Sequence, residues 1–298
     1  MPVAESNGIE IAYETFGSAD DPALLLVMGL GCQLILWDEE LCRMFAERGF
    51  YVIRFDNRDI GLSSKIEGGP QPNPLAAMTG DASSASYTLE DMAADTAGLL
   101  DQLGIEAAHV AGVSMGGMIA QQLAISHPER VISLTSIMST TGDPNVGQPL
   151  PQAIPALVGP SPSDREGYVE FNVQVFKTIG SPAYPPEEEW LRRMAGASYD
   201  RCHYPVGFMR QLLGIIASPD RTAALASVRV PTLVIHGKAD PLITVSGGEA
   251  TARAVPGAKL IEIEGMGHDL PRELWPKFVD AIAENAARAR AAAPTRGD

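Results

Sequence analysis

Short apolar runs and longer segments with helical periodicity alternate along most of this chain. The apolar runs are mostly continuous, as expected of strands covered on both faces, and they occupy residues 24–28, 51–55, 109–113, 131–137, 232–236 and 259–263. Helices are predicted between them, over residues 37–48, 89–103, 115–126, 246–254 and 274–289. Strands and helices in this order predict βαβ units around a mostly parallel sheet, and therefore an α/β fold.

Two segments depart from that alternation. Residues 9–14 alternate apolar and polar side chains after Asn7 and Gly8, which predicts an edge hairpin with one solvated face. From residue 141 to residue 227 the chain is rich in proline and shows helical stretches near 165–179 and 187–199, but no strand pattern. Structureless loops of that length are rare in compact domains. The sequence therefore predicts a catalytic core formed by residues 1–140 and 228–298, interrupted by a helical cap at 141–227.

Composition narrows the possible partners. The 298 residues are 45% hydrophobic and carry a formal net charge of −15 with no run of Lys or Arg, which argues against nucleic acid and anionic membrane surfaces. No apolar stretch reaches the roughly 20 residues of a membrane helix, and the N-terminus lacks the pattern of a signal peptide. Cys32, Cys42 and Cys202 fit neither a disulfide framework nor a zinc site. We expect a soluble, cytoplasmic protein without metal or cofactor; the oligomeric state is not readable.

The motif with the most chemical content is G-x-S-x-G at residues 112–116, which centres on Ser114. An apolar strand precedes it and a helix follows it, which is the context that a nucleophile elbow requires. The sharp turn holds the serine hydroxyl above the sheet at the positive end of a helix. Ser114 is therefore predicted to be a nucleophile, and a serine nucleophile needs a histidine base oriented by a carboxylate.

The chain offers five histidines for that base. His109 precedes the nucleophile too closely, His127 ends a helix, His203 belongs to the insertion, and His236 ends a strand, where it is expected to be packed. His268 is the remaining histidine, in a loop between the last strand and the last helix. Its position at the carboxyl edge of the sheet makes His268 the predicted base.

The acid and the oxyanion donors follow from chain order and loop position. Asp240 lies in the loop after the penultimate strand. Among the folds that carry the common catalytic triads, one has the chain order nucleophile, acid, base, which is the order of Ser114, Asp240 and His268. Asp143, which follows the strand after the nucleophile helix, remains the rival acid. The backbone N–H groups of Met115 and Leu30 are the predicted oxyanion donors.

Taken together, residues 54–63, 112–117, 231–241 and 265–268 resemble the α/β-hydrolases, and among them the aclacinomycin methylesterase-like group of serine esterases. Such hydrolases commonly have His-Gly at the oxyanion loop, whereas this chain has Met28-Gly29, which keeps the backbone donor and removes a bracing side chain. The resemblance implies an α/β-hydrolase fold whose inserted cap forms the substrate pocket. The residues expected to line that pocket are Met28, Trp190, Met194, Phe208 and Met209.

The function expected from this site is hydrolysis of a carboxylic ester through an acyl-enzyme. The substrate would be a small molecule, a neutral short- to medium-chain or small hydrophobic ester, because a net negative field disfavours anionic ones. The same triad also serves a dedicated methylesterase of a polyketide or terpenoid, a C–C bond hydrolase and a perhydrolase. A ligand-binding module on the same fold is the non-enzymatic alternative.

Overall fold

A computed structural model describes residues 1–159 and 161–292, so the last six residues of the expected core lie outside the described part. An eight-stranded sheet has the order β1-β2-β4-β3-β5-β6-β7-β8. The strands are β1 (Val3–Ser6), β2 (Ile9–Phe16), β3 (Ala23–Val27), β4 (Tyr51–Phe55), β5 (Ala108–Val113), β6 (Val131–Ile137), β7 (Thr232–Gly237) and β8 (Lys259–Ile263). Strands β1, β2 and β4 pair antiparallel, and all pairs from β4 to β8 are parallel. The predicted α/β fold with a mostly parallel sheet is confirmed.

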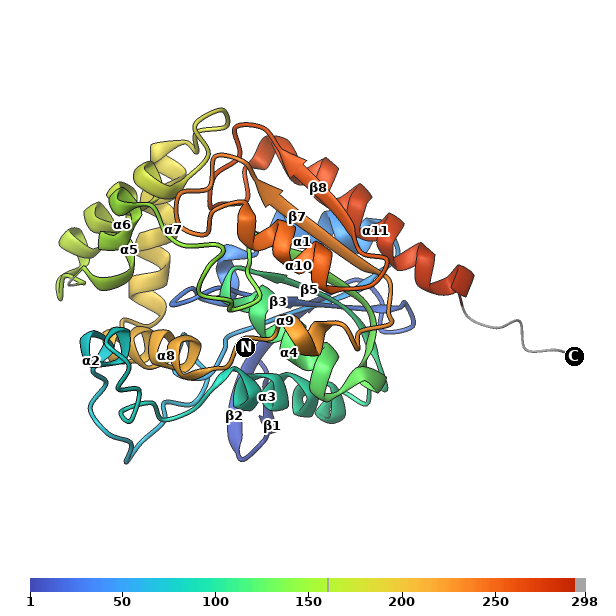
Figure 1. Ribbon diagram of the computed structural model, residues 1–298, viewed down its shortest axis with the longest axis horizontal. Helices are drawn as coiled ribbons and strands as arrows, with labels where there is room; N and C mark the ends of the chain where they lie inside the picture. Colours follow the sequence, from blue (N-terminus) through green and yellow to red (C-terminus); the bar gives the residue numbers. More distant parts are fainter. Residues whose placement is uncertain (160, 293–298) are drawn as a thin grey trace, which may run out of the picture.

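Helices cover both faces of this sheet (Figure 1). Helices α1 (Glu39–Glu47) and α11 (Trp275–Ala292) pack on one face, around Phe45 and Phe278. Helices α3 (Leu89–Gln102) and α4 (Met115–Ser126) pack on the other face. Strands β3 and β5 are buried along their whole length, because both faces are covered, and this explains why their sequences read as continuous apolar runs.

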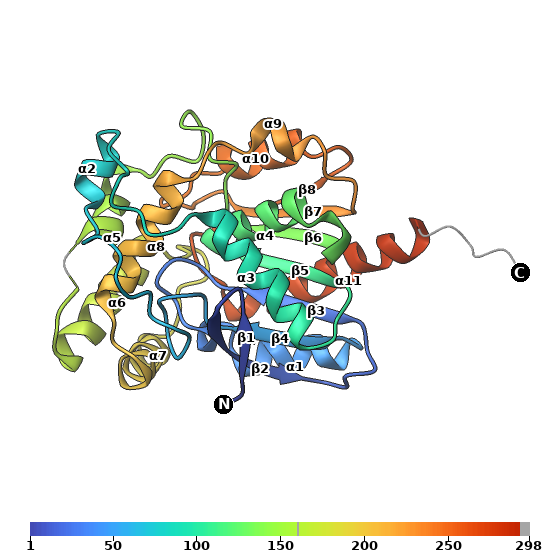
Figure 2. The same cartoon turned by 90° about the horizontal axis from the view of Figure 1, so that it is seen from below.

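The segment between β6 and β7 forms helices and, among its described residues, no strand. We call residues 141–227 the helical insertion; it contains α5 (Ile154–Val158), α6 (Arg165–Ile179), α7 (Glu188–Arg201), α8 (Pro205–Ala217) and α9 (Thr222–Leu225). Helices α5 to α8 group at one end of the sheet, together with α2 (Pro74–Met78) from the core (Figure 2). Helix α9 instead contacts α10 (Ser246–Ala254) and α4. Short 3-10 helices occupy Leu34–Leu36, Pro128–Arg130, Pro151–Ala153 and Arg272–Leu274.

Parallel strands bring the loops of distant sequence segments together at one edge of the sheet. The loops after β3, β5, β7 and β8 begin at Met28, Ser114, Lys238 and Glu264, and they share the carboxyl edge that the helical insertion faces. The fold therefore places the predicted site residues in one region. None of the described helices is both long enough and apolar enough to cross a membrane.

Candidate active site

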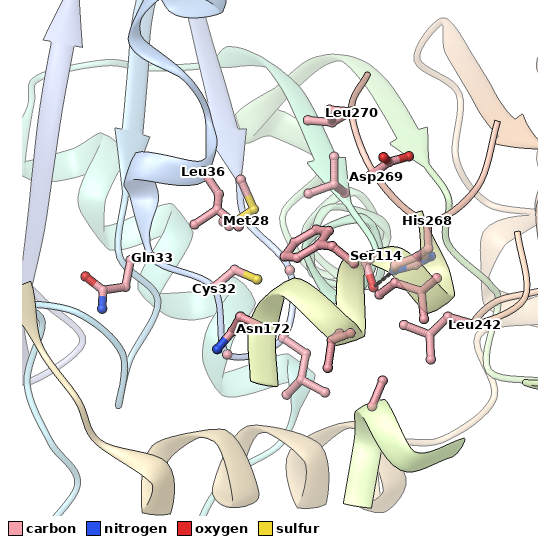
Figure 3. Close-up of a pocket in the computed structure, with 18 of the residues that line it drawn as sticks. Met28, Cys32, Gln33, Leu36, Ser114, Asn172, Leu242, His268, Asp269 and Leu270 are labelled. Atoms are coloured by element: carbon pink, nitrogen blue, oxygen red, sulfur yellow. Dashed lines mark hydrogen bonds between the residues drawn. The ribbon is translucent and has the colours of Figure 1, made fainter. Parts of the chain in front are cut away.

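Ser114 forms the sharp turn between β5 and α4. Its backbone has φ 55° and ψ −122°, an unfavourable conformation for a residue other than glycine, and its N–H donates to Ile137 O at 2.9 Å. The turn brings α4 directly against β3, where a Cβ on Gly116 would lie 2.1 Å from Val27 O. The glycine two residues after Ser114 is therefore required by close backbone approach, and the turn presents the Ser114 hydroxyl to the cavity (Figure 3).

His268 and Asp240 form a chain of hydrogen bonds with Ser114. His268 Nε2 lies 2.9 Å from Ser114 Oγ, and His268 Nδ1 lies 2.7 Å from Asp240 Oδ2. His268 is 8% exposed and Asp240 is 3% exposed, so both interactions are largely shielded from water. A carboxylate acceptor at Nδ1 fixes the tautomer in which Nε2 is free to take a proton from the serine.

The carboxylate of Asp240 is itself held by the backbone that follows it. Its Oδ1 accepts hydrogen bonds from Leu242 N at 2.8 Å and Ile243 N at 2.9 Å, which leaves Oδ2 for the histidine. The rival Asp143 does not take part in this arrangement, because its Oδ1 accepts from Asn145 N at 2.8 Å within its own turn.

The other histidines lie elsewhere. His109 Nδ1 bonds Ser133 Oγ at 2.8 Å in the sheet, and burial lowers the pKa of His109 to about 4. His127 is the C-terminal cap residue of α4. Buried His236 donates from Nε2 to Ile243 O at 2.8 Å, and burial lowers the pKa of its imidazole, so it stays neutral beside Asp240. His203 stacks on Tyr199 in the helical insertion.

The loop after β3 passes directly over the nucleophile. A Cβ on Gly29 would lie 3.2 Å from Ser114 Cβ. The carbonyl of Gly29 accepts a hydrogen bond from Cys32 N at 3.2 Å, and in a trans peptide the N–H of Leu30 then points the opposite way. Met115 is the first residue of α4, so its N–H belongs to the positive end of that helix. The two predicted oxyanion donors therefore flank Ser114, one on the loop after β3 and one at the first residue of α4.

Two side chains that the sequence did not single out hold this loop. Asn57 Nδ2 donates to Met28 O at 3.0 Å. Gln211, fully buried on α8, accepts from Gly31 N at 2.8 Å and donates to Arg58 O at 2.9 Å. These contacts brace a loop that lacks the usual histidine at position 28. Asn57 and Gln211 are far along the chain from the loop that they hold, so the sequence does not show these contacts. The one signal for Gln211 is that an amide side chain interrupts a mostly apolar segment.

A cavity of about 1000 Å³ opens onto Ser114 and His268. Met28, Trp190, Phe208 and Met209 line it, as the sequence predicted. Met194 is not among the residues that line it; it lines a smaller cavity of about 50 Å³ that adjoins the main one and shares Cys32, Trp190 and Leu191 with it. Figure 3 shows Leu242 beside Ser114 and His268, with Leu36, Cys32, Gln33 and Asn172 on the opposite side of the view; all of these residues line the cavity.

The thiol of Cys32 is another possible nucleophile in the cavity wall. Burial raises the pKa of the Cys32 thiol to about 11, so this lining residue stays protonated at neutral pH and does not compete with Ser114. Within residues 1–159 and 161–292, no group of three or more His, Cys, Asp or Glu side chains is arranged to hold a metal ion.

Comparison with known proteins concerns the chain as a whole. The family model for the alpha/beta hydrolase fold matches residues 22–271. Rhodomycin D methylesterase DnrP of Streptomyces peucetius is 29% identical over 290 residues, which cover 90% of this chain and 92% of that protein. The resemblance to the methylesterase-like group of this fold is thereby confirmed.

Two enol-lactonases are also similar. The 3-oxoadipate enol-lactonase 2 of Acinetobacter baylyi is 25% identical over 81% of this chain and 80% of that protein. The crystal structure of the enol-lactonase from Burkholderia xenovorans LB400 superposes with a TM-score of 0.74 at 26% identity, over 96% of this chain and all of that one (100%). The activities named for these relatives are those of a methylesterase and of enol-lactonases.

Proposed function

Because this chain belongs to the alpha/beta hydrolase fold family, we propose that it is a serine hydrolase of carboxylic esters with Ser114, His268 and Asp240 as its catalytic residues. One observation carries the proposal: the hydrogen-bond chain Ser114 Oγ, His268 Nε2, His268 Nδ1, Asp240 Oδ2 ends in the wall of a large, mostly apolar cavity. A nucleophile, an oriented base and a flanking pair of backbone donors are the requirements of acyl transfer.

In the first half of the reaction, Ser114 Oγ attacks the ester carbonyl carbon while its proton passes to His268 Nε2. Asp240 stabilises the imidazolium that forms, and the N–H groups of Leu30 and Met115 bind the negative oxygen of the tetrahedral intermediate. Collapse of the intermediate breaks the C–O bond of the ester. The departing alcohol takes the proton from His268, and the acyl group remains on Ser114.

In the second half, a water molecule repeats the attack on the acyl-enzyme. His268 removes the proton from that water, and the same two N–H groups stabilise the second oxyanion. The proton then returns to Ser114 Oγ, and the carboxylic acid is released. The net reaction consumes one water and forms one acid and one alcohol.

The substrate class follows from the cavity. Its walls near Ser114 are apolar and come from both the core and the helical insertion, which we propose acts as a cap over residues 1–140 and 228–298. The charged residues that line the cavity are of both signs, so they favour neither an anionic nor a cationic substrate: Glu187, Arg193, Asp269, Arg272 and Glu273. We therefore propose neutral, hydrophobic esters, of short to medium chain or with a small hydrophobic acyl group.

Cavity size supports a second candidate, a methylesterase that acts on a bulky acyl group. About 1000 Å³ is at the upper end of the roughly 300–1000 Å³ of ligand pockets, so a short acyl chain fills only part of it. Aromatic side chains from the helical insertion, including Phe171, Phe176 and Trp190, would contact a planar ring system. The similarity to a rhodomycin D methylesterase supports the same substrate type.

The test compares the wild type with Ser114→Ala on p-nitrophenyl esters of increasing acyl length, methyl esters of polycyclic acids, lactones and diketones. Ser126→Ala, an exposed serine at the other end of α4, is the matched control. We expect Ser114→Ala to lose more than about 10³-fold in kcat and to lose labelling by a fluorophosphonate, while the control keeps both. Activity of Ser114→Ala near the wild-type level would refute the nucleophile, and an unlabelled wild type would favour a binding module.

A further inference from the structure

The loop that carries His268 is joined to the helical insertion by a set of hydrogen bonds. His268 N donates to Ile179 O at 2.7 Å, at the last residue of α6. Ala183 N donates to Gly265 O at 3.1 Å in the opposite direction. The turn after α6 and the loop after β8 therefore run side by side, and their backbones pair as two neighbouring strands would.

Ser181 adds the side-chain part of this contact. Its Oγ accepts a hydrogen bond from Gly267 N at 2.8 Å and donates to the Asp269 carboxylate. A serine hydroxyl has one hydrogen and two lone pairs, so the bond to Asp269 orients a lone pair toward Gly267. Ser181 is 2% exposed, which means that water does not replace either bond. One hydroxyl thus holds the residues on both sides of His268.

Close packing leaves this loop little freedom. A Cβ on Gly267 would lie 2.3 Å from Gly180 O, so the two backbones are in contact directly beside His268. Asp269 takes no part in the hydrogen-bond chain of the triad, because its carboxylate is directed to Ser181. Among the described residues, the hydrogen bonds from His268 itself to the core are those of its ring, to Asp240 and Ser114, while Ala239 N donates to Met266 O at 3.0 Å earlier in the loop.

We propose that Ser181 is a positioning residue of the reaction: it fixes the loop of His268, so that the helical insertion as well as the sheet determines the geometry of the triad. The inference rests on the proposed function of Ser114 and His268. It implies that a movement of the insertion that widens the cavity also withdraws the base from Ser114. Substrate entry and assembly of the catalytic residues are then linked through this contact, to which Ser181 contributes the side-chain hydrogen bonds.

The test uses three variants at position 181 and one control in the full-length protein. Ser181→Ala removes both bonds, Ser181→Thr keeps the hydroxyl, and Ser181→Cys has nearly the same shape with weaker hydrogen bonding. Ser218→Ala is the matched control, because Ser218 Oγ also joins the insertion to the core, at 2.9 Å from Leu89 N, but on the α3 side of the sheet.

We expect kcat to fall about tenfold or more in Ser181→Ala, with KM changed by less than about twofold, because a misplaced base slows the chemical step without altering the cavity. In Ser181→Cys, kcat should fall several-fold, and this variant serves as the test if the alanine variant does not fold. Ser181→Thr and Ser218→Ala should retain most of kcat. Thermal unfolding, measured for each variant, ensures that all are compared well below their Tm.

Two readouts make the outcome independent of the substrate. The rate of Ser114 labelling by a fluorophosphonate should fall with kcat in Ser181→Ala. The far-downfield proton resonance of the His268 to Asp240 hydrogen bond should shift or broaden in Ser181→Ala and stay unchanged in Ser218→Ala. Wild-type kcat and an unchanged resonance in Ser181→Ala would overturn the proposal, as would equal losses in Ser218→Ala or in Ser181→Thr.

The failure of the proposed function gives a different result. If Ser114 is not a nucleophile, the wild type itself is not labelled and Ser114→Ala is as active as the wild type. The resonance of His268 still reports whether Ser181 positions that side chain. A shift there without any hydrolysis would leave the positioning contact established and its catalytic role refuted.

Discussion

Replacing Asp240 by asparagine reverses one hydrogen bond in the proposed triad. Asp240 Oδ1 accepts from Leu242 N and Ile243 N, and an asparagine oxygen can keep both bonds. The amide nitrogen then occupies the place of Oδ2, 2.7 Å from His268 Nδ1 in the native protein. Because that nitrogen donates, His268 Nδ1 must accept, and the ring proton moves to Nε2.

The size of the effect follows from this tautomer change. With a proton on Nε2, the atom that lies 2.9 Å from Ser114 Oγ cannot accept the serine proton. The corresponding substitution in the serine protease triad lowers kcat by about 10⁴, and we expect a loss of about 10³ to 10⁴ here. That loss corresponds to about 4 to 5 kcal/mol of transition-state stabilisation. The free energy of unfolding should change by about 1 kcal/mol or less, because the backbone bonds remain.

The assay is steady-state hydrolysis of the best ester from the substrate panel, with fluorophosphonate labelling as a second measure. Asp143→Asn is the control, because Asp143 is the rival acid in sequence and accepts only from its own turn in the structure. It should keep wild-type kcat. A loss below about tenfold in Asp240→Asn, or a larger loss in Asp143→Asn, would refute the assignment of the acid.

Two further predictions concern buried polar side chains. Gln211→Leu removes the hydrogen bonds to Gly31 N and Arg58 O, so kcat/KM should fall about tenfold because the oxyanion loop is displaced. The loss of kcat/KM in Gln211→Glu should be smaller. Wild-type kcat/KM in both variants would contradict this role of Gln211. Burial lowers the pKa of His109 from an ordinary value of 6.5 to about 4 in the folded protein. As pH falls from about 6.5 to about 4, the unfolded chain therefore binds a proton at His109 that the folded protein does not, and the free energy of unfolding decreases. Urea unfolding at pH 7 and pH 4.5 should therefore show that the wild type loses about 2 kcal/mol more than His109→Gln, and equal losses would count against the shift.

The elements of the core could be predicted because their signals are local. Strand β4 and helix α4 have the predicted bounds, since a continuous apolar run and a nucleophile turn followed by a helical pattern are both readable within a dozen residues. Helix α8 was missed for a physical reason. Its polar residues Arg210 and Gln211 are buried against the core instead of facing water, so the helix has no solvated polar face to mark its period.

Some residues of the candidate site could likewise be predicted from the sequence, and others could not. Ser114, Asp240 and His268 stand out in the sequence because strand order in a parallel sheet sends the loops after β5, β7 and β8 to one edge. Met194 was expected to line the main cavity and instead lines the small cavity that adjoins it, because an apolar residue on a helix does not show in the sequence which cavity it faces.

The sequence by itself determined the fold class, the nucleophile turn and the loops that meet at the edge of the sheet. Each depends on local steric rules, such as the positive φ of 55° that the turn at Ser114 requires, or on the period of apolar residues. Only the tertiary structure decided which side chains hold those loops in place. Ser181 and Gln211 act across 86 and 180 residues of chain, and a hydrogen bond over such a separation leaves no periodic pattern in the sequence.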